Sequence, residues 1–136
     1  MRTYLEEIAT ADIAVDIEAN TLNELFEEAG ISFSECTAEL DNVEEKIEKE
    51  IVLEAETIEK LLFKFLEELV FIKDTELTIF KSFNCKIKDN KLVCKAKGEE
   101  LDQTKHVVLD DIKAITYHQF KVRKEKNWKA RIIFDI

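Results

Sequence analysis

The sequence predicts an α+β domain in which two helices pack on a mostly antiparallel sheet. Apolar residues recur at helical spacing in residues 22–33 and 58–70, whereas the other apolar segments alternate with a period of two, as half-buried strands do. After residue 77 the expected strands follow one another without a helix between them, which favours antiparallel neighbours. The 136 residues include no proline and two glycines, so we expect one domain over residues 1–136 with short connections.

The first half of the chain is expected to form a strand, a helix and a second strand. Residues 12–19 alternate between apolar and polar types and predict a half-buried strand. Thr21-Leu-Asn-Glu24 matches a capping box, in which the threonine hydroxyl and the glutamate carboxylate bond the first free amides of a helix. Gly30 should weaken the far end of that helix. The second strand is expected at residues 51–55, after an acidic stretch.

Residues 58–70 predict the strongest helix of the chain. Their apolar side chains repeat at i, i+3, i+4 and i+7, while charged residues lie mostly on the other face. The apolar positions are Ile58, Leu61, Leu62, Phe65, Leu66, Leu69 and Val70. The helix is too short for a coiled coil or a membrane span, so we expect it to pack on the sheet.

A β-hairpin is expected around Asp89-Asn90, because alternating apolar residues flank these two turn-forming residues. A two-residue turn there places Cys85 directly opposite Cys94. We interpret both thiols as small buried groups in a reducing compartment, and a disulfide is the alternative. Neither cysteine, nor Cys36, has the C-x-x-C spacing of a zinc site.

The remaining residues predict a loop and two further strands. The loop runs through Gly98 and Asp102, and a long strand follows at residues 111–122. After a short turn at residues 125–127, the final strand covers residues 128–136 and is rich in β-branched and aromatic types.

Charge is unevenly distributed along the chain. Residues 1–76 carry 6 basic and 22 acidic side chains, a net charge of −16, whereas residues 77–136 carry 14 basic and 8 acidic ones, a net charge of +6. The overall charge of −10 argues against non-specific binding to DNA or other phosphate backbones. The basic half can form a patch; the alternative is that it is the solvated face of a sheet whose other face is core.

The sequence contains neither a membrane span nor a signal-peptide pattern, so we expect a cytoplasmic protein. The common phosphate-binding and catalytic motifs, such as G-x-x-x-x-G-K-[ST] and G-x-S-x-G, are absent. His106 and His118 have no spacing that favours a nucleophilic pair with a cysteine. We assign no catalytic residue and do not expect an enzyme.

Carboxylates at the ends of two expected strands are the most informative groups. Asp12 begins the first strand, and Asp135 and the terminal carboxylate of Ile136 end the last one. If these strands are neighbours, three hard oxygen ligands converge, which suits Ca²⁺, with Mg²⁺ or Mn²⁺ possible. The alternative interpretation is that Asp12 caps a turn and Asp135 pairs with a lysine.

Short motifs spread over the whole chain, in order, resemble the archease family. Thr10-Ala-Asp12 resembles the end of its H-T-A-D opening, and the L-E-E-L and D-T-E motifs are present at residues 66–69 and 74–76. The remaining matches are Gly98-Glu99, Asp102, Lys105-His106, Lys113-Ala-Ile-Thr-Tyr-His118, Trp128 and Ile133-Phe-Asp-Ile136. The sequence departs from the family at Ala9, where the family has histidine, and at Ala14 and Gln119, where it has glycine.

The resemblance implies an accessory factor of an RtcB-type tRNA-splicing RNA ligase. Such a factor promotes guanylylation of the ligase and its multiple turnover, and meets tRNA through the ligase. The resemblance also implies a calcium site formed by Asp12, Asp135 and Ile136. Two other functions stay open from the residues themselves: a small metal-dependent hydrolase that uses the same carboxylates, and an RNA-binding module on the basic half. Tyr117 and His118 are expected to point to opposite faces of their strand, with one of them in the core.

Overall fold

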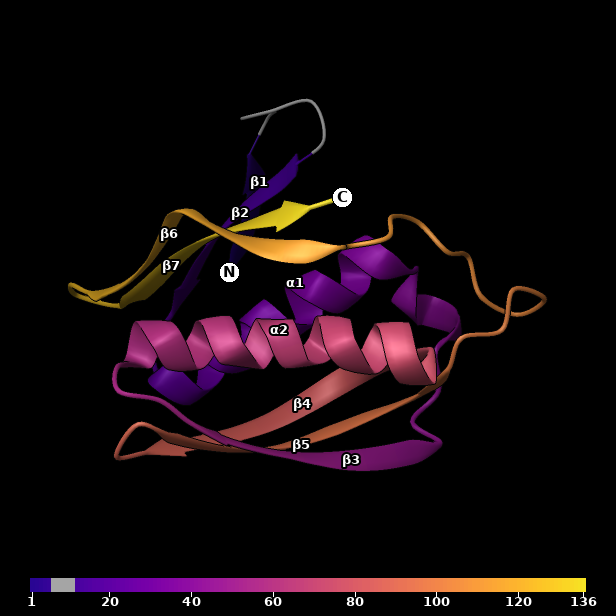
Figure 1. The fold of residues 1–136 in the computed structure, drawn as a ribbon, viewed down its shortest axis with the longest axis horizontal. Coiled ribbons are helices and arrows are strands. Elements are labelled where there is room, and N and C mark those ends of the chain that lie inside the picture. The colour runs from indigo at the N-terminus through magenta and orange to yellow at the C-terminus, as the bar shows by residue number, and fades with distance from the viewer. Residues whose placement is uncertain (6–11) are drawn as a thin grey trace.

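Two helices lie between two antiparallel sheets in the computed structural model, which describes residues 1–5 and 12–136 apart from the side chain of His118 (Figure 1). The four-stranded sheet has the order β1-β2-β7-β6, and the three-stranded sheet has the order β3-β5-β4. The helices are α1 (Leu22–Thr37) and α2 (Ile58–Glu76). The α+β class with two helices is confirmed, but the strands form two sheets, one on each side of the helices.

The strands of the two sheets have the following bounds. The four-stranded sheet contains β1 (Arg2–Leu5), β2 (Asp12–Ala19), β6 (Ala114–Lys124) and β7 (Trp128–Asp135). The three-stranded sheet contains β3 (Ile47–Glu54), β4 (Thr78–Lys88) and β5 (Lys91–Glu100). A single 3-10 turn (Leu40–Asn42) follows α1. Among the described residues, neither helix is long and apolar enough to cross a membrane.

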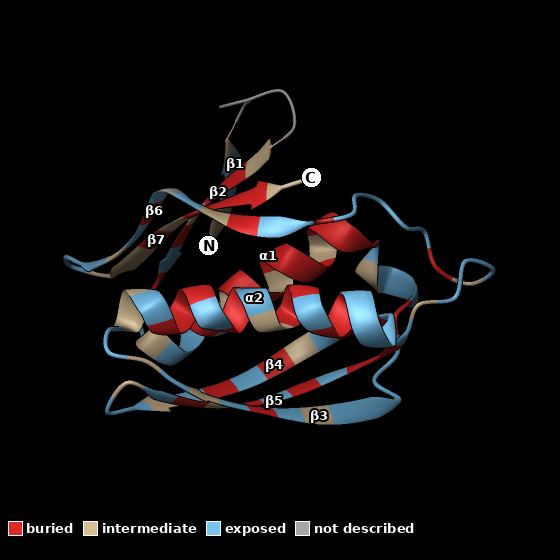
Figure 2. Cartoon of the chain, viewed as in Figure 1, coloured by how far each residue is buried: buried red, intermediate tan, exposed pale blue. Residues whose placement is uncertain are grey.

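The core fills the space between the helices and the inner faces of both sheets (Figure 2). Phe65 of α2 is fully buried, and its ring centroid lies 5.9 Å from that of Phe26 on α1 and 6.0 Å from that of Phe83 on β4. On the other side of the helices, the ring of Phe33 meets Phe134 of β7 edge-on at 6.2 Å. The aromatic side chains therefore connect both sheets through the helix layer.

Both helices begin after a threonine cap, and the sequence predicted the cap at Thr21. Thr21 Oγ1 accepts a hydrogen bond from the Glu24 amide at 3.1 Å, and Thr57 caps α2 in the same way through the Lys60 amide. Gly30 lies inside α1 instead of near its end, because the helix continues to Thr37. An added Cβ at Gly30 would lie 2.9 Å from ring atoms of Phe83, so the glycine allows β4 to approach the helix closely.

The predicted hairpin is confirmed in its turn and its register. Asp89 and Asn90 both have positive φ, 52° and 58°, as a two-residue hairpin turn requires, and Cys85 is the direct partner of Cys94. The two sulfur atoms lie 3.2 Å apart as free, buried thiols. The hydrogen bond between them and their burial raise the pKa of Cys85.

Four features of the strands differ from the prediction. β1 was not expected, β3 begins at Ile47 instead of residue 51, and Gly98 belongs to β5 instead of a loop. A Cβ at Gly98 would lie 1.9 Å from the carbonyl oxygen of Ile79, so only glycine fits where β4 is irregular between Phe80 and Ser82. β6 covers residues 114–124 with a register shift between Thr116 and Lys121, which period-two alternation does not reveal.

Candidate metal centre

Asp12 and Asp135 are direct partners across the antiparallel strands β2 and β7. Directly opposed side chains of such a pair have Cβ atoms about 4.5–5.5 Å apart. The inner-face neighbours of this pair are Ile13 and Phe134, and Phe134 is fully buried. Because side chains alternate between the faces of a strand, Asp12 and Asp135 lie together on the outer face, away from the helices.

The main chain at this pair is fixed from both sides. β7 lies between β2 and β6, and Asp135 faces Ala114 of β6 as well as Asp12 of β2. The Asp135 carbonyl oxygen accepts a hydrogen bond from the Lys113 amide at 2.7 Å. Ile136 is half-buried against the core, so its carboxyl group follows directly after this fixed position.

The donor set at this edge suits a hard cation. Two half-buried aspartates and the carboxyl group of Ile136 offer only oxygen atoms, which Ca²⁺ prefers. The described residues contain no group of three or more His, Cys, Asp or Glu that could hold a metal, so within this part of the chain the carboxyl group of Ile136 is the third candidate ligand. Among those residues no salt bridge involves Asp135, so the alternative pairing with a lysine has no support.

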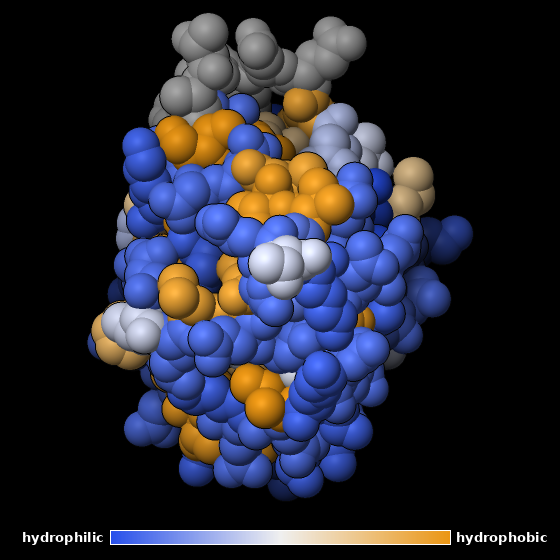
Figure 3. Space-filling model, turned by 90° about the vertical axis from the view of Figure 1, so that its right-hand side faces the viewer, coloured by the Kyte–Doolittle hydropathy of each residue, from blue (hydrophilic) through white to orange (hydrophobic). Residues whose placement is uncertain are grey.

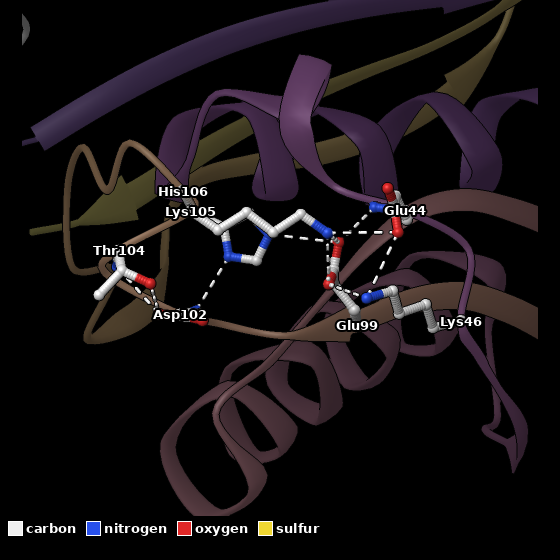
Figure 4. A network of polar contacts seen from close by, with 7 residues as sticks. All are labelled: Glu44, Lys46, Glu99, Asp102, Thr104, Lys105 and His106. Carbon is white, nitrogen blue, oxygen red and sulfur yellow. Dashed lines mark hydrogen bonds and ion pairs between the residues drawn. The ribbon is translucent and has the colours of Figure 1, made fainter.

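A second polar cluster lies near the start of the loop at residues 101–113 (Figure 4). Glu99, at 6% exposure, accepts hydrogen bonds from the amide of Glu44 and, at 2.9 and 3.0 Å, from the ammonium of Lys105. The hydrogen bond from the Glu44 amide and, as the smaller contribution, that from Lys105 lower the pKa of Glu99 to about 2. Lys46 adds a longer contact of 3.8 Å. The Gly98-Glu99 and Lys105-His106 motifs therefore meet in one ion-pair network around the buried Glu99 carboxylate.

His106 completes this network as a buried ring. Its Nδ1 accepts a hydrogen bond from the Asp102 amide at 2.9 Å, so Nε2 carries the proton of the neutral ring. Nε2 lies 3.2 Å from Oε2 of Glu99, although the contact lacks good hydrogen-bond geometry. Asp102 itself accepts from the Thr104 hydroxyl and amide, which lowers the pKa of that carboxyl. These bonds shape the turn at residues 102–106.

The rest of the loop is fixed against α1 and α2. The amide of Leu109 donates to the carbonyl oxygen of Thr37 at 2.8 Å, and a β-bridge joins Val108 to Ala38. The buried ammonium of Lys73 contacts Asp111 and Asp74, and these carboxylates raise its pKa more than burial lowers it.

The fixed loop nevertheless exposes three consecutive apolar side chains: Val107, Val108 and Leu109 are 45–49% exposed. Figure 3 views this end of the molecule and shows hydrophobic areas within a mainly hydrophilic surface. Because the Lys113 amide bonds the Asp135 carbonyl oxygen, the loop ends next to the carboxylate pair.

The structure places the other predicted residues as follows. Tyr117 is 58% exposed, and its ring stacks on that of Phe63 of α2 with the ring centroids 3.9 Å apart. The side chain of His118 and all of Ala9 and Thr10 lie outside the described residues. Gln119 has a φ of 59°, a left-handed conformation that favours glycine, which explains the glycine expected there. Ala14 of β2 is buried opposite Ile133.

The sequence reading missed a groove of about 580 Å³ on the outer face of the four-stranded sheet, at the end opposite the carboxylate pair. Four cationic side chains of β6 and β7 line it: Lys121, Arg123, Lys129 and Arg131. The signal was available, because these residues alternate on either side of the predicted turn at residues 125–127.

Comparisons with known proteins agree with the motifs. Residues 3–136 match the model of the Archease protein family. The protein named archease of Pyrococcus abyssi is 40% identical over 133 residues, covering 93% of this chain and 94% of that protein, and the one of Pyrococcus furiosus is 36% identical over the full length of both. The solution structure of Methanobacterium thermoautotrophicum protein 1598 is similar, with a TM-score of 0.86 and 33% identity over 99% of this chain and 98% of that one. The chain therefore belongs to the archease family.

Proposed function

We propose that this chain is a non-catalytic accessory factor of an RtcB-type tRNA-splicing RNA ligase, which promotes ligase guanylylation and multiple turnover in the cytoplasm. Family membership supports the accessory role. We further propose that Asp12, Asp135 and the carboxylate of Ile136 bind Ca²⁺, or Mg²⁺ or Mn²⁺ in its place. The observation that carries this site is the direct opposition of Asp12 and Asp135 on the outer face of the sheet.

A cation at this position would neutralise carboxylates that otherwise repel each other. Like charges directly opposite each other on a sheet destabilise the pairing, so the two aspartates alone weaken the ends of β2 and β7. Asp12, Asp135 and the carboxylate of Ile136 would hold the cation, which would supply positive charge at this corner. The role of the three residues is then to hold this corner of the molecule in one geometry for a partner.

The neighbouring loop offers a surface on which that partner can dock. Val107, Val108 and Leu109 are apolar, exposed and held by main-chain hydrogen bonds, so their burial costs little conformational entropy. Residues 1–76, with a net charge of −16, would meet a basic, RNA-binding ligase by charge complementarity, which mainly raises the association rate. We therefore place the ligase contact at the end of the molecule that carries the loop and the carboxylate pair.

A turnover assay tests this proposal. A cognate ligase is incubated with GTP, its metal and cleaved RNA, with and without a sub-stoichiometric amount of this protein, and ligated product is counted per ligase molecule. We expect several turnovers with the wild type, a strong loss with Asp135→Asn, and no loss with Asp89→Asn. The control removes one carboxylate at the β4–β5 turn, where asparagine tolerates the positive φ.

Two results would contradict the proposal. If the ligase forms no more than one ligated product per ligase molecule in the presence of the wild type, the accessory role is excluded. Hydrolysis of the RNA by the protein alone, lost in Asp135→Asn, would support the alternative of a metal-dependent hydrolase.

A further inference from the structure

We propose that the groove on the outer face of the four-stranded sheet binds the phosphate backbone of a single-stranded RNA segment directly. The inference goes beyond an indirect contact through the ligase, and the choice of RNA among polyanions rests on the proposed function. It starts from the register of β6 and β7. Lys121 is the direct partner of Arg131, and Arg123 is the direct partner of Lys129.

Four cations therefore occupy a two-by-two array on one face of the sheet. Like charges directly opposite each other destabilise a sheet, so this arrangement opposes folding unless an anion compensates it. Compensation within the chain is partial. Arg131 forms a bidentate ion pair with Asp16 at 2.8 Å, and Lys129 and Arg123 share Glu125 at 3.0 and 3.5 Å. Among the described residues no salt bridge involves Lys121.

The outer face of the other sheet carries fewer like-charge pairs. There each lysine of β5 faces a glutamate of β3: Lys97 faces Glu48, Lys95 faces Glu50, and Lys91 faces Glu54. Cations opposite anions are the arrangement that stabilises a sheet by itself. On their other side the cations of β7 also face anions, since Arg131 faces Asp16 and Lys129 faces Glu18 of β2. Lys91 of β5 in turn also faces Lys88 of β4, a single like-charge pair beside the hairpin turn. What distinguishes β6 and β7 is that two like-charge pairs follow each other on one face.

The groove concentrates positive charge in an acidic protein. It is lined by the four cations and by two acidic residues, Asp16 and Glu18, so its side chains carry a net charge of +2, whereas the whole chain carries −10. Met1 also lines the groove, and its ammonium group donates to the Glu18 carbonyl oxygen at 2.7 Å. A charged concave surface of this kind attracts the opposite charge more strongly than a flat one does.

The spacing of the cations favours a nucleic-acid strand over a compact anion. Alternate residues of a strand lie about 6.7 Å apart, which is close to the separation of successive phosphates in an extended strand. Arg131 and Asp135 lie on the same face of β7 about 13 Å apart along the strand. An RNA segment in the groove would therefore run along the sheet toward the carboxylate pair and the end at which we place the ligase.

Direct binding is measured with a fluorescein-labelled single-stranded RNA and the purified full chain, by anisotropy, in EDTA and without ligase. We expect affinity to fall as KCl rises from about 25 to about 200 mM. The double variant Lys121→Gln/Arg123→Gln should bind about tenfold more weakly at the lower salt and reduce the salt slope by about 1.4, at about 0.7 for each lost phosphate contact. Removing one member of each like-charge pair should not destabilise the sheet.

The matched control is Lys95→Gln/Lys97→Gln, which changes the net charge equally on the outer face of the other sheet. It should bind within about twofold of the wild type if the groove is the site. No binding by the wild type at low salt, or an equal loss in both double variants, would overturn the proposal. Equal binding of poly-glutamate and RNA would overturn the choice of RNA. Because the assay contains no ligase and no metal, its failure leaves the turnover test of the accessory role standing.

Discussion

Asp12 and Asp135 stand directly opposite each other on β2 and β7, so two carboxylates share one edge of the outer sheet face. The fold holds them there through the main chain, because Asp135 is paired with strands on both sides. The pair is a like-charge contact, and in the proposed metal site it would become part of a ligand set. This dual character gives opposite expectations for stability in the two conditions.

Asp135→Asn should therefore change stability in a direction that depends on calcium. In chelator, the variant is expected to be as stable as the wild type or up to about 1 kcal/mol more stable, because one like-charge contact is removed. With Ca²⁺ at about 100 times its Kd, the wild type should gain about 2.7 kcal/mol and the variant far less. Thermal denaturation with and without Ca²⁺, together with calorimetric titration, measures both effects. Equal calcium-dependent gains in the two proteins would remove Asp135 from the site.

Extension of the chain by one glycine after Ile136 should weaken Ca²⁺ binding. The extension converts the Ile136 carboxylate into an amide, which keeps a carbonyl oxygen but loses the negative charge. The half-buried Ile136 side chain stays in place, so stability in chelator should match that of the unextended chain. Calorimetric titration of the two proteins side by side measures the change. Unaltered affinity in the extended protein would exclude the carboxylate of Ile136 as a ligand.

Acid should destabilise the protein through Glu99. Its pKa is about 2 in the folded protein against an ordinary value of 4.5, so folding favours the ionised form. The resulting stabilisation is fully present above about pH 4.5 and is lost as the pH falls through that value toward 2. Glu99→Gln should be less stable at neutral pH and should show a shallower loss over this range in urea denaturation. Parallel pH curves for the two proteins would contradict the prediction.

Phe65→Ala should remove about 3–5 kcal/mol from the free energy of unfolding, because the ring is fully buried between Phe26 and Phe83. Phe71 on the same helix is 57% exposed, so Phe71→Ala is expected to change stability by less than about 0.5 kcal/mol. Chemical denaturation of both variants compares a buried and an exposed phenylalanine within one helix. Similar losses of unfolding free energy in the two variants would contradict the assignment of Phe65 to the core.

The sequence predicted those features of the fold that are set by residues close together in the chain. The cap at Thr21, the register of Cys85 with Cys94 and the period of α2 follow from spacing alone, because each is set by contacts within a few residues. Period-two alternation says that a strand has a buried face but not which sheet it joins. The division of the seven strands into two sheets therefore had to come from the structure.

The candidate site was predictable in its residues but not in its geometry. Asp12 and Asp135 are recognisable as carboxylates at strand ends, yet their pairing depends on β7 entering the sheet between β2 and β6. The residue type at Gln119 did not predict the irregular segment, because glutamine seldom adopts a positive φ; the glycine that the family has there was the available indication. The expectation that Tyr117 and His118 point to opposite faces rests on regular alternation, which the register shift between Thr116 and Lys121 interrupts.

The position of β7 between β2 and β6 also has a kinetic consequence. Asp16 and Arg131 form an ion pair across 115 positions of the chain, whereas Cys85 and Cys94 meet across nine. Closing the longer loop is slower and costs more entropy, so β4 and β5 should gain protection from hydrogen exchange before β2 and β7 during refolding. Pulse labelling during refolding tests this order by comparing the Cys94 amide of β5 with the Ile132 amide of β7. A cation between Asp12 and Asp135 would bind only molecules in which β7 has paired with β2. Metal binding would therefore distinguish the folded protein from late folding intermediates.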